Sequence, residues 1–275
     1  MKKKSITLII GITIILLSFL TYIFVFGKLF PYSPIIIGFT KHTLSNTIIY
    51  IQKDNNSTNY DWVDSLIPSV EKFHELKFKS KPKIFFFRDK RTYSHRSLSK
   101  ARFCAFTNGN IVVSPWAQKE AEEGKISMEI YLKHELSHSI ILQNKGILAG
   151  LKYPKWLLEG IATYSVNQMG TSFYPSKEET YTLIKQGNFM PPHYFHTKKE
   201  SQIKLNVKYI PPFMYSEFAC IVDYLIETRG REKFLVYMKS LLKDNNHNKV
   251  FKDIYGIDFD EFILNFRKFI ENNNG

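Results

Sequence analysis

Cysteine is scarce in this sequence, and its scarcity excludes two kinds of fold. The 275 residues contain only two cysteines, Cys104 and Cys220. Two are too few for a disulfide-dense scaffold or for a four-cysteine zinc module. We expect two buried free thiols, although the residues alone leave a single disulfide open. Internal repeats are also missing, and hydrophobic residues make up 44% of the chain, which favours a packed globular core.

Acidic residues are few relative to basic ones. The chain has 38 lysines and arginines against 25 aspartates and glutamates, a net charge of +13, which raises the question of a nucleic-acid or membrane partner. No zinc-finger, RNA-recognition or helix-turn-helix signature is present, so we expect no nucleic-acid binding. Residues 1–28 contain four lysines and no acid. The remaining excess is scattered and predicts a mildly basic solvated surface, with attraction to anionic lipid or wall polymer as one consequence.

Charge is absent from one long run near the N-terminus. Three lysines precede an uncharged stretch from Ile6 to Phe26, and about 20 apolar residues are enough to cross a bilayer as a helix. The stretch ends without an A-x-A cleavage pattern, which argues against a removed secretory signal. The lysines ahead of it favour a cytoplasmic N-terminus. We therefore predict a signal anchor at residues 1–28, in a single-pass cell-membrane protein whose remaining chain is extracytoplasmic.

The rest of the chain divides into a short connection and one domain. Residues 29–46 contain two prolines and a glycine and predict a linker or stalk, so the folded domain is expected at 47–275. Its first part favours β-structure, and from Ser127 onward the periodicity is mainly helical. This order predicts an α+β fold with a small sheet in the N-terminal part. The elements expected before Ser127 are strands at 47–51, 83–87 and 111–114, and a helix from Asp61 to Leu76 that Pro68 kinks.

One predicted helix carries an H-E-x-x-H pattern. Ser127 is suited to cap this helix and Gly146 to end it, and between them lies His134-Glu135-Leu136-Ser137-His138. The two histidines are one helical turn apart on one face, a spacing at which two imidazoles share a metal ion. Glu135 is offset by one position and can instead reach a metal-bound water as general base. The alternative is two surface histidines on an amphipathic helix, one of them buried by accident.

A catalytic zinc site needs a third protein ligand, and Glu159 is the candidate. It falls inside a mostly apolar helix that begins after Pro154. A carboxylate among apolar neighbours is costly to bury without a partner, and a metal ion would be such a partner. Gly160 beside it would let another backbone come close. The alternative is an exposed glutamate on an amphipathic helix.

These residues resemble the gluzincin metallopeptidases, in particular the bacterial peptidase MA-like families. The resemblance rests on H-E-L-S-H at 134–138 and W-L-L-E-G-I-A-T-Y at 156–164. In layout it extends over residues 47–271, including the stretches that begin at Phe213 and Gly256. More distant similarity is to thermolysin and to the aminopeptidase N family. The resemblance implies a zincin-like α+β fold.

It also implies the roles of the site residues. His134, His138 and Glu159 would be the ligands of one Zn²⁺ ion, and Glu135 would be the catalytic base. The strand at 111–114 would be the sheet edge that pairs with an extended substrate.

Tyr215 is our candidate for the group that stabilises the oxyanion together with zinc. It lies in the stretch that resembles the family helix after the metal site, and Tyr209, His193 and His196 compete for the role.

Two features depart from the family pattern. Thermolysin-like members carry an aspartate four residues after the third ligand, which orients the first histidine, and this chain has Thr163 there. The orienting group is therefore open. The G-x-M-E-N exopeptidase signature of the aminopeptidase N family is absent, which favours an endopeptidase.

The sequence thus predicts a membrane-anchored, extracytoplasmic zinc metallopeptidase that hydrolyses peptide or protein substrates. The alternative is a catalytically silent peptidase-like domain that binds or regulates at the membrane; such a domain would usually have lost a ligand or the base. A third reading is a helical membrane protein in which the motif is accidental. The residues indicate neither the particular substrate nor the oligomeric state.

Overall fold

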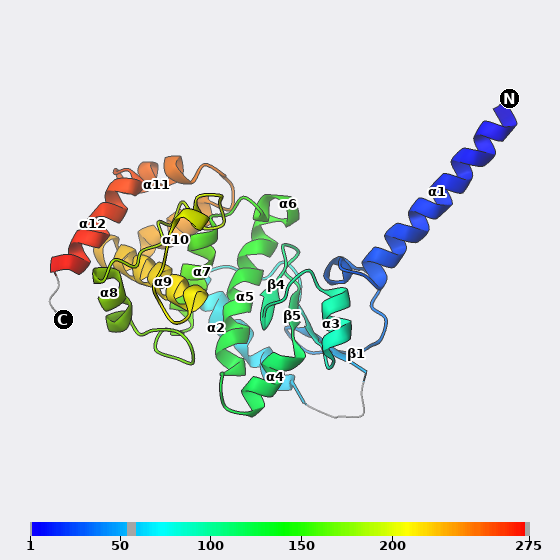
Figure 1. Cartoon of the computed structure of the whole chain (residues 1–275), viewed down its shortest axis with the longest axis horizontal. Helices are drawn as coiled ribbons and strands as arrows, with labels where there is room; N and C mark the ends of the chain where they lie inside the picture. Colours follow the sequence, from blue (N-terminus) through cyan, green and yellow to red (C-terminus); the bar gives the residue numbers. More distant parts are fainter. Residues whose placement is uncertain (1, 54–58, 273–275) are drawn as a thin grey trace.

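A single long helix leads into a small mixed sheet, after which the chain is almost entirely helical (Figure 1). The computed structural model describes residues 2–53 and 59–272. The order of elements confirms the α+β class expected from the sequence, with the sheet in the first half of the chain.

Helix α1, Lys2–Val25, projects away from the rest of the protein (Figure 1). Its segment Ile6–Val25 has a mean hydropathy of 2.7, and only 6% of it is buried. It is therefore long and apolar enough to cross a membrane.

The segment after α1 is not the free linker that its prolines predicted. It forms a 3₁₀ turn, η1 (Phe30–Tyr32), and a strand, β1 (Phe39–Thr43). Phe30 is fully buried and stacks on Phe39 with ring centroids 5.2 Å apart. The prediction of a linker throughout 29–46 was wrong, because these two phenylalanines bury their rings against the sheet.

The sheet has five strands in the order β1-β2-β3-β5-β4. The central pairs β2–β3 and β3–β5 are parallel, and the outer pairs β1–β2 and β5–β4 are antiparallel. Strand β5 was expected at the edge, and this was wrong, because β4 pairs with it and takes that edge. Besides β1, the strands are Ile48–Gln52 (β2), Lys83–Phe86 (β3), Phe103–Ala105 (β4) and Ile111–Val113 (β5).

The apolar run of β3 is buried on both sides of the sheet. Successive side chains of a strand point to opposite faces. Ile84 and Phe86 join the large core that the sheet shares with the helices, whereas Phe85 and Phe87 join a smaller cluster with Phe30. Because both faces of β3 are buried, its sequence is continuously apolar, whereas a strand with one exposed face would alternate apolar and polar residues.

Helices make up the rest of the protein. The helix expected from Asp61 changes type near Pro68: it starts as a 3₁₀ turn and continues as an α-helix with proline in its first turn. Both cysteines are free, as expected, but only Cys220 is buried, and Cys104 is half-buried. The bounds are Asp61–Leu66 (η2), Ile67–His74 (α2), Lys90–Arg96 (α3), Pro115–Glu122 (α4), Met128–Lys145 (α5), Ile147–Gly150 (α6), Lys155–Ser165 (α7), Lys177–Lys185 (α8), Glu200–Gln202 (η3), Ile210–Arg229 (α9), Arg231–Ser240 (α10), His247–Tyr255 (α11) and Phe259–Asn272 (α12).

Helices α7 and α9 are in close contact at Gly160. A Cβ atom placed there would lie 2.7 Å from the carbonyl oxygen of Phe218. This confirms the prediction that Gly160 admits a neighbouring backbone, and it fixes the helix that carries Glu159.

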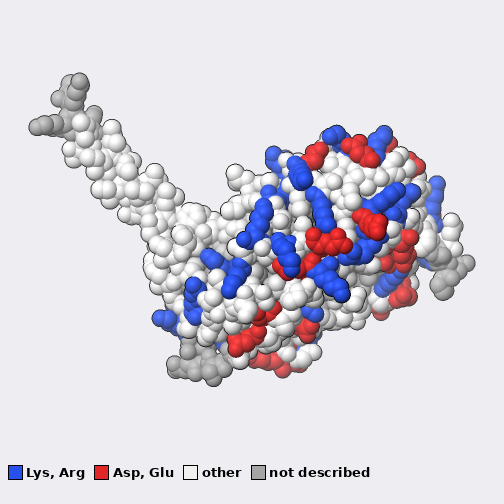
Figure 2. All heavy atoms as spheres, turned by 180° about the vertical axis from the view of Figure 1, so that it is seen from behind, with Lys and Arg blue, Asp and Glu red and all other residues white. Residues whose placement is uncertain are grey.

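Charged side chains are spread over the body of the protein. On the face in Figure 2, lysines and arginines are interspersed with aspartates and glutamates, and the described part of the projecting helix carries neither. This distribution matches the scattered basic excess expected from the sequence.

Candidate metal centre

Helix α5 carries two of the candidate ligands and the candidate base. The Ser127 hydroxyl accepts a hydrogen bond from the backbone N–H of Ile130, and Gly146, at φ +93°, follows the last helical residue. Both ends of the helix are therefore where the sequence predicted them. His134, Glu135 and His138 are all buried.

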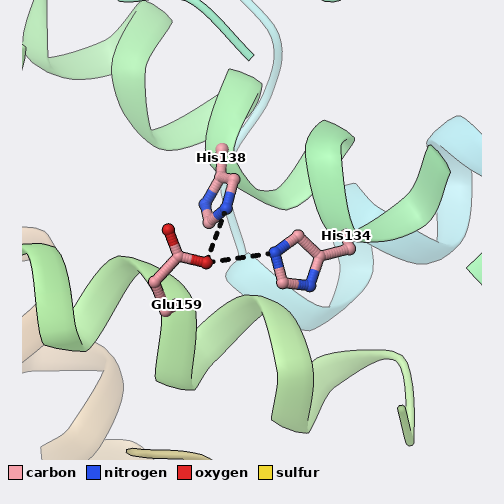
Figure 3. Close-up of side chains that lie close together, drawn as sticks. All are labelled: His134, His138 and Glu159. Atoms are coloured by element: carbon pink, nitrogen blue, oxygen red, sulfur yellow. Dashed lines mark hydrogen bonds and ion pairs between the residues drawn. The ribbon is translucent and has the colours of Figure 1, made fainter. Parts of the chain in front are cut away.

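Three side chains from α5 and α7 point toward one another (Figure 3). The Nε2 atoms of His134 and His138 lie 3.3 and 3.4 Å from the same oxygen, Oε2 of Glu159. One donor atom from each residue lies within 4.8 Å of the other two. Two donors bound to one tetrahedral zinc ion, each about 2.0–2.1 Å from it, lie about 3.3–3.4 Å apart. The predicted ligands are thus brought together at a spacing that fits a metal ion.

The hydrogen bond on the other side of His134 supports the same assignment. Its Nδ1 lies 2.7 Å from Oε1 of Gln168. An amide oxygen only accepts hydrogen bonds, so Nδ1 donates to Gln168, and Nε2 is the ring nitrogen that faces Glu159. The carboxylate also accepts only. The 3.3 Å hydrogen bond between Nε2 and Oε2 and a shared metal ion are two alternative ways of joining these atoms, and a divalent metal ion would bind both.

The charge state of Glu159 suits a ligand. Burial alone would raise its pKa, but the charge of His138 and hydrogen bonds with both histidines hold the pKa well below its usual range. For His138, burial alone would lower the pKa, and the Glu159 carboxylate raises it instead. Glu159 is therefore ionised at neutral pH, the state in which a carboxylate binds a metal.

Glu135 lies beside the three ligands without joining them. Its Oε2 accepts a hydrogen bond of 2.6 Å from the backbone N–H of Ala105, the last residue of β4. Burial raises the pKa of Glu135, although the neighbouring His138 and His134 counteract the rise. A carboxylate with a raised pKa binds a proton more tightly, which favours the role of general base.

Tyr215 forms part of the wall of this site. Its ring stacks on that of His134, with centroids 6.2 Å apart and an angle of 23°. Burial raises the pKa of Tyr215 well above its usual value. Tyr174, which the sequence did not single out, lies next to it with centroids 6.4 Å apart.

The three competitors for the role of Tyr215 have other surroundings. Tyr209 precedes α9 and packs on Phe173. His193 lies 3.7 Å from Asp260, and His196 is exposed. The structure therefore brings Tyr215 next to a ligand, and no contact of the other three with the ligands is found among the described residues.

Sequence reasoning missed Gln168, the residue that holds the ring of His134. The position at which the family resemblance led us to look for an orienting aspartate is occupied by Thr163, whose buried hydroxyl has no hydrogen-bond partner in the described part of the chain. Gln168 lies in the turn that follows α7, and its side chain orients the ring of His134 instead. No local pattern marks this glutamine in the sequence.

Comparison with known proteins gives little beyond the site itself. No protein-family model matches the sequence, and no curated protein does. Among solved structures, the M1 zinc metallopeptidase from Deinococcus radiodurans is similar at 11% identity and a TM-score of 0.42. The match covers 84% of this chain and 50% of that one, so the chain spans about half the length of that protein.

Proposed function

We propose that this protein is a zinc-dependent peptidase with a zincin-like fold of the gluzincin type. The observation that supports it most is the convergence of His134, His138 and Glu159, with the carboxylate of Glu135 beside them and not among the ligands. A site with three protein ligands and a separate base is the arrangement that metal-assisted hydrolysis requires.

The proposed chemistry divides between the metal and the protein. A zinc ion held by the three ligands would supply a Lewis acid and a water of lowered pKa. Glu135 takes a proton from the attacking water and passes it to the leaving amine. The Ala105 N–H holds the Glu135 carboxylate in place for both transfers. Tyr215, kept protonated by its raised pKa, is our candidate donor to the developing oxyanion.

We propose that the substrate is an extended peptide that pairs with β4. In the sheet as described, β4 has one neighbouring strand, β5, and so its other edge, apart from the Ala105 N–H that Glu135 binds, is offered to a partner. The link from Ala105 to Glu135 places this edge beside the base. Strand pairing along a substrate, together with the missing G-x-M-E-N signature, favours cleavage within a chain.

The decisive test uses the full chain purified in detergent. We expect about one zinc per chain and cleavage of a peptide library that a chelator abolishes and zinc restores. Glu135→Gln should keep the zinc and lose at least about 100-fold in turnover. Glu129→Gln is the matched control, because Glu129 is an exposed glutamate on the same helix. Zinc binding without cleavage would favour the silent binding domain, and an active Glu135→Gln variant would refute the mechanism.

The anchor is tested separately. We propose that α1 is retained and crosses the cell membrane with the N-terminus in the cytoplasm and the catalytic domain outside. We expect the protein to stay in the membrane pellet after alkaline carbonate extraction, with residues 1–28 still present by mass spectrometry. Release by carbonate, or a mature chain that begins after the apolar helix, would overturn the anchor and leave the proposed catalysis untouched.

A further inference from the structure

The base of α1 is fastened to the body of the protein. The Lys28 ammonium donates hydrogen bonds to the carbonyl oxygens of Ser94 and Ser97, the second at 3.1 Å. The Tyr22 hydroxyl lies 3.2 Å from Nε2 of His95. A helix that is held at its base on α3 fixes which side of the body faces the bilayer that the helix crosses.

Exposed apolar side chains gather around this base, and we call them the apolar collar. They are Phe26, Ile35, Ile37 and Leu98, which are 38%, 54%, 45% and 58% exposed. Arg96 ties two of them together, because its guanidinium lies 5.5 Å from the ring of Phe26 and donates to the carbonyl oxygen of Ile37. Where the projecting helix meets the body in Figure 2, the surface is largely free of charged side chains.

A second group of exposed apolar residues, the α6 tip, lies on the same side of the body (Figure 1). It lies near the segment that leaves α1: a Cβ placed on Gly150 of α6 would be 4.0 Å from Cβ of Thr107, and the Thr107 hydroxyl is 3.0 Å from that of Tyr32. The α6 tip consists of Ile147, Leu148 and Leu151, which are 52%, 80% and 61% exposed.

Lysines border a pocket of about 470 Å³ beside the base of α1. Its lining includes Lys28, Lys90 and Lys100 together with the rings of Tyr93 and Trp116. Lys90 and Lys100 are exposed and form no ion pair within the part of the chain that the structure describes. Ammonium groups around an apolar floor match a lipid, which joins an anionic headgroup to acyl chains.

We propose that the apolar collar, the α6 tip and these lysines seat the body on the outer leaflet of the bilayer that α1 crosses. The apolar side chains enter the interface, and Lys90 and Lys100 meet the phosphates of the headgroups. Single apolar residues on a protein surface need no explanation. The apolar collar, however, surrounds the base of α1, where the helix would enter the bilayer if it is an anchor, and the α6 tip lies on the same side of the body. The inference rests on the proposed anchor and is independent of catalysis.

The test places a polarity-sensitive dye on the α6 tip in full-length protein reconstituted into vesicles of phosphatidylcholine with phosphatidylglycerol. Leu148→Cys provides the thiol, and Leu264→Cys on α12, whose leucine is 51% exposed, is the matched control. The native thiols should not react at neutral pH, because burial raises the pKa of Cys104 to about 12 and that of Cys220 well above its usual value.

We expect lipids that carry a quencher near the headgroup to remove most of the emission at position 148, and iodide in the water to remove little. Apolar side chains in the interface lie about 5–10 Å deep, so a quencher near the bilayer centre should act less. At position 264 the lipid quencher should have no effect and iodide a strong one. Equal iodide quenching at the two positions would overturn the proposal.

The lysines are tested in the same vesicles. Adding phosphatidylglycerol to phosphatidylcholine should strengthen lipid quenching at position 148, and Lys90→Gln with Lys100→Gln should remove that gain. Lys233→Gln with Lys268→Gln, which changes two exposed lysines elsewhere, should retain it. A gain that survives loss of Lys90 and Lys100 would refute their role at the headgroups. Carbonate extraction of each variant separates these outcomes from a failure of the anchor itself.

Discussion

Gly160 sits beside the third candidate ligand at a place where no larger residue fits. A Cβ at this position would lie 2.7 Å from the carbonyl oxygen of Phe218 and 2.9 Å from its carbonyl carbon. Real Cβ contacts essentially never fall below 3.0 Å. Both atoms belong to the backbone of α9, so Gly160→Ala must push α7 and α9 apart.

The cost follows from two opposing effects. Forcing an extra methyl group into a packed interface costs about 1–3 kcal/mol, and replacing glycine by alanine inside a helix returns about 0.5–1 kcal/mol. We expect a net loss of about 1–2 kcal/mol in the free energy of unfolding. For a domain of this size that lowers the melting temperature by roughly 2–8 °C.

The same displacement should weaken metal binding. Glu159 precedes Gly160 on α7, and the histidines are on α5, so moving α7 changes the distances of 3.3 and 3.4 Å between the donors. Metal sites tolerate deviations of only about 0.2 Å. We expect zinc affinity to fall by about 10-fold or more, the size of effect seen when a ligand loses its support. Chelator competition and thermal unfolding with and without zinc measure both effects.

Gly150→Ala is the control for this prediction. A Cβ there would lie 2.9 Å from Cδ2 of Leu142, a distance similar to that at Gly160. The obstacle is the end of a flexible side chain and can turn away, so we expect little loss of stability and no loss of zinc. A Gly160→Ala variant with the melting temperature and zinc affinity of the wild type would refute the reasoning, as would equal damage in both variants.

Three further substitutions test the support of the site and two buried polar groups of the helical part. Gln168→Leu frees the ring of His134 and should lower zinc affinity about 10–100-fold in chelator competition. Thr163→Val replaces a buried, unpartnered hydroxyl and should raise the free energy of unfolding by about 1 kcal/mol without changing zinc affinity. Burial raises the pKa of Glu217 well above its usual value, so the folded state keeps a proton that the unfolded state releases, and stability falls as pH rises above about 4.5. Glu217→Gln should remove this pH dependence of stability. The melting temperature of the variant minus that of the wild type must therefore increase from pH 5 to pH 8, and a constant difference would contradict the prediction.

The core of the candidate site could be predicted from sequence because its geometry is local. His134 and His138 are one turn apart in one helix, and a helix fixes their relation. Glu159 and Gly160 followed from a second local argument, a carboxylate and a glycine among apolar residues. The sequence alone does not show that α5 and α7 pack together, and this contact comes from the structure.

Gln168 could not be predicted, for a physical reason. Helix α7 ends at Ser165, and Asn167 then adopts a positive φ of 51°. This turn places the Gln168 side chain next to His134. The role of Gln168 therefore depends on one local backbone conformation, which many different sequences adopt. No periodic pattern in the sequence predicts this conformation.

The outer strands were missed because they are short and poorly patterned. Strand β1 buries only Phe39 of its five residues, and β4 has three residues, of which only Phe103 is fully buried. Neither shows the alternation by which a half-buried strand is recognised. Their positions are set by pairing with β2 and β5, which are distant in sequence.

Strand β4 and the turn after it connect the base of α1 to the candidate base. The side-chain amides of Asn108 and Asn110 donate to the carbonyl oxygen of Pro31, at 2.8 and 2.7 Å, in the first turn after α1. The chain that reaches this turn has just left β4, where the Ala105 N–H holds Glu135. One short stretch, residues 105–110, therefore contacts both the turn that follows α1 and the carboxylate of Glu135. If α1 is retained in the bilayer, the edge strand β4 keeps a fixed direction relative to the membrane surface, and that surface limits how a substrate can approach it.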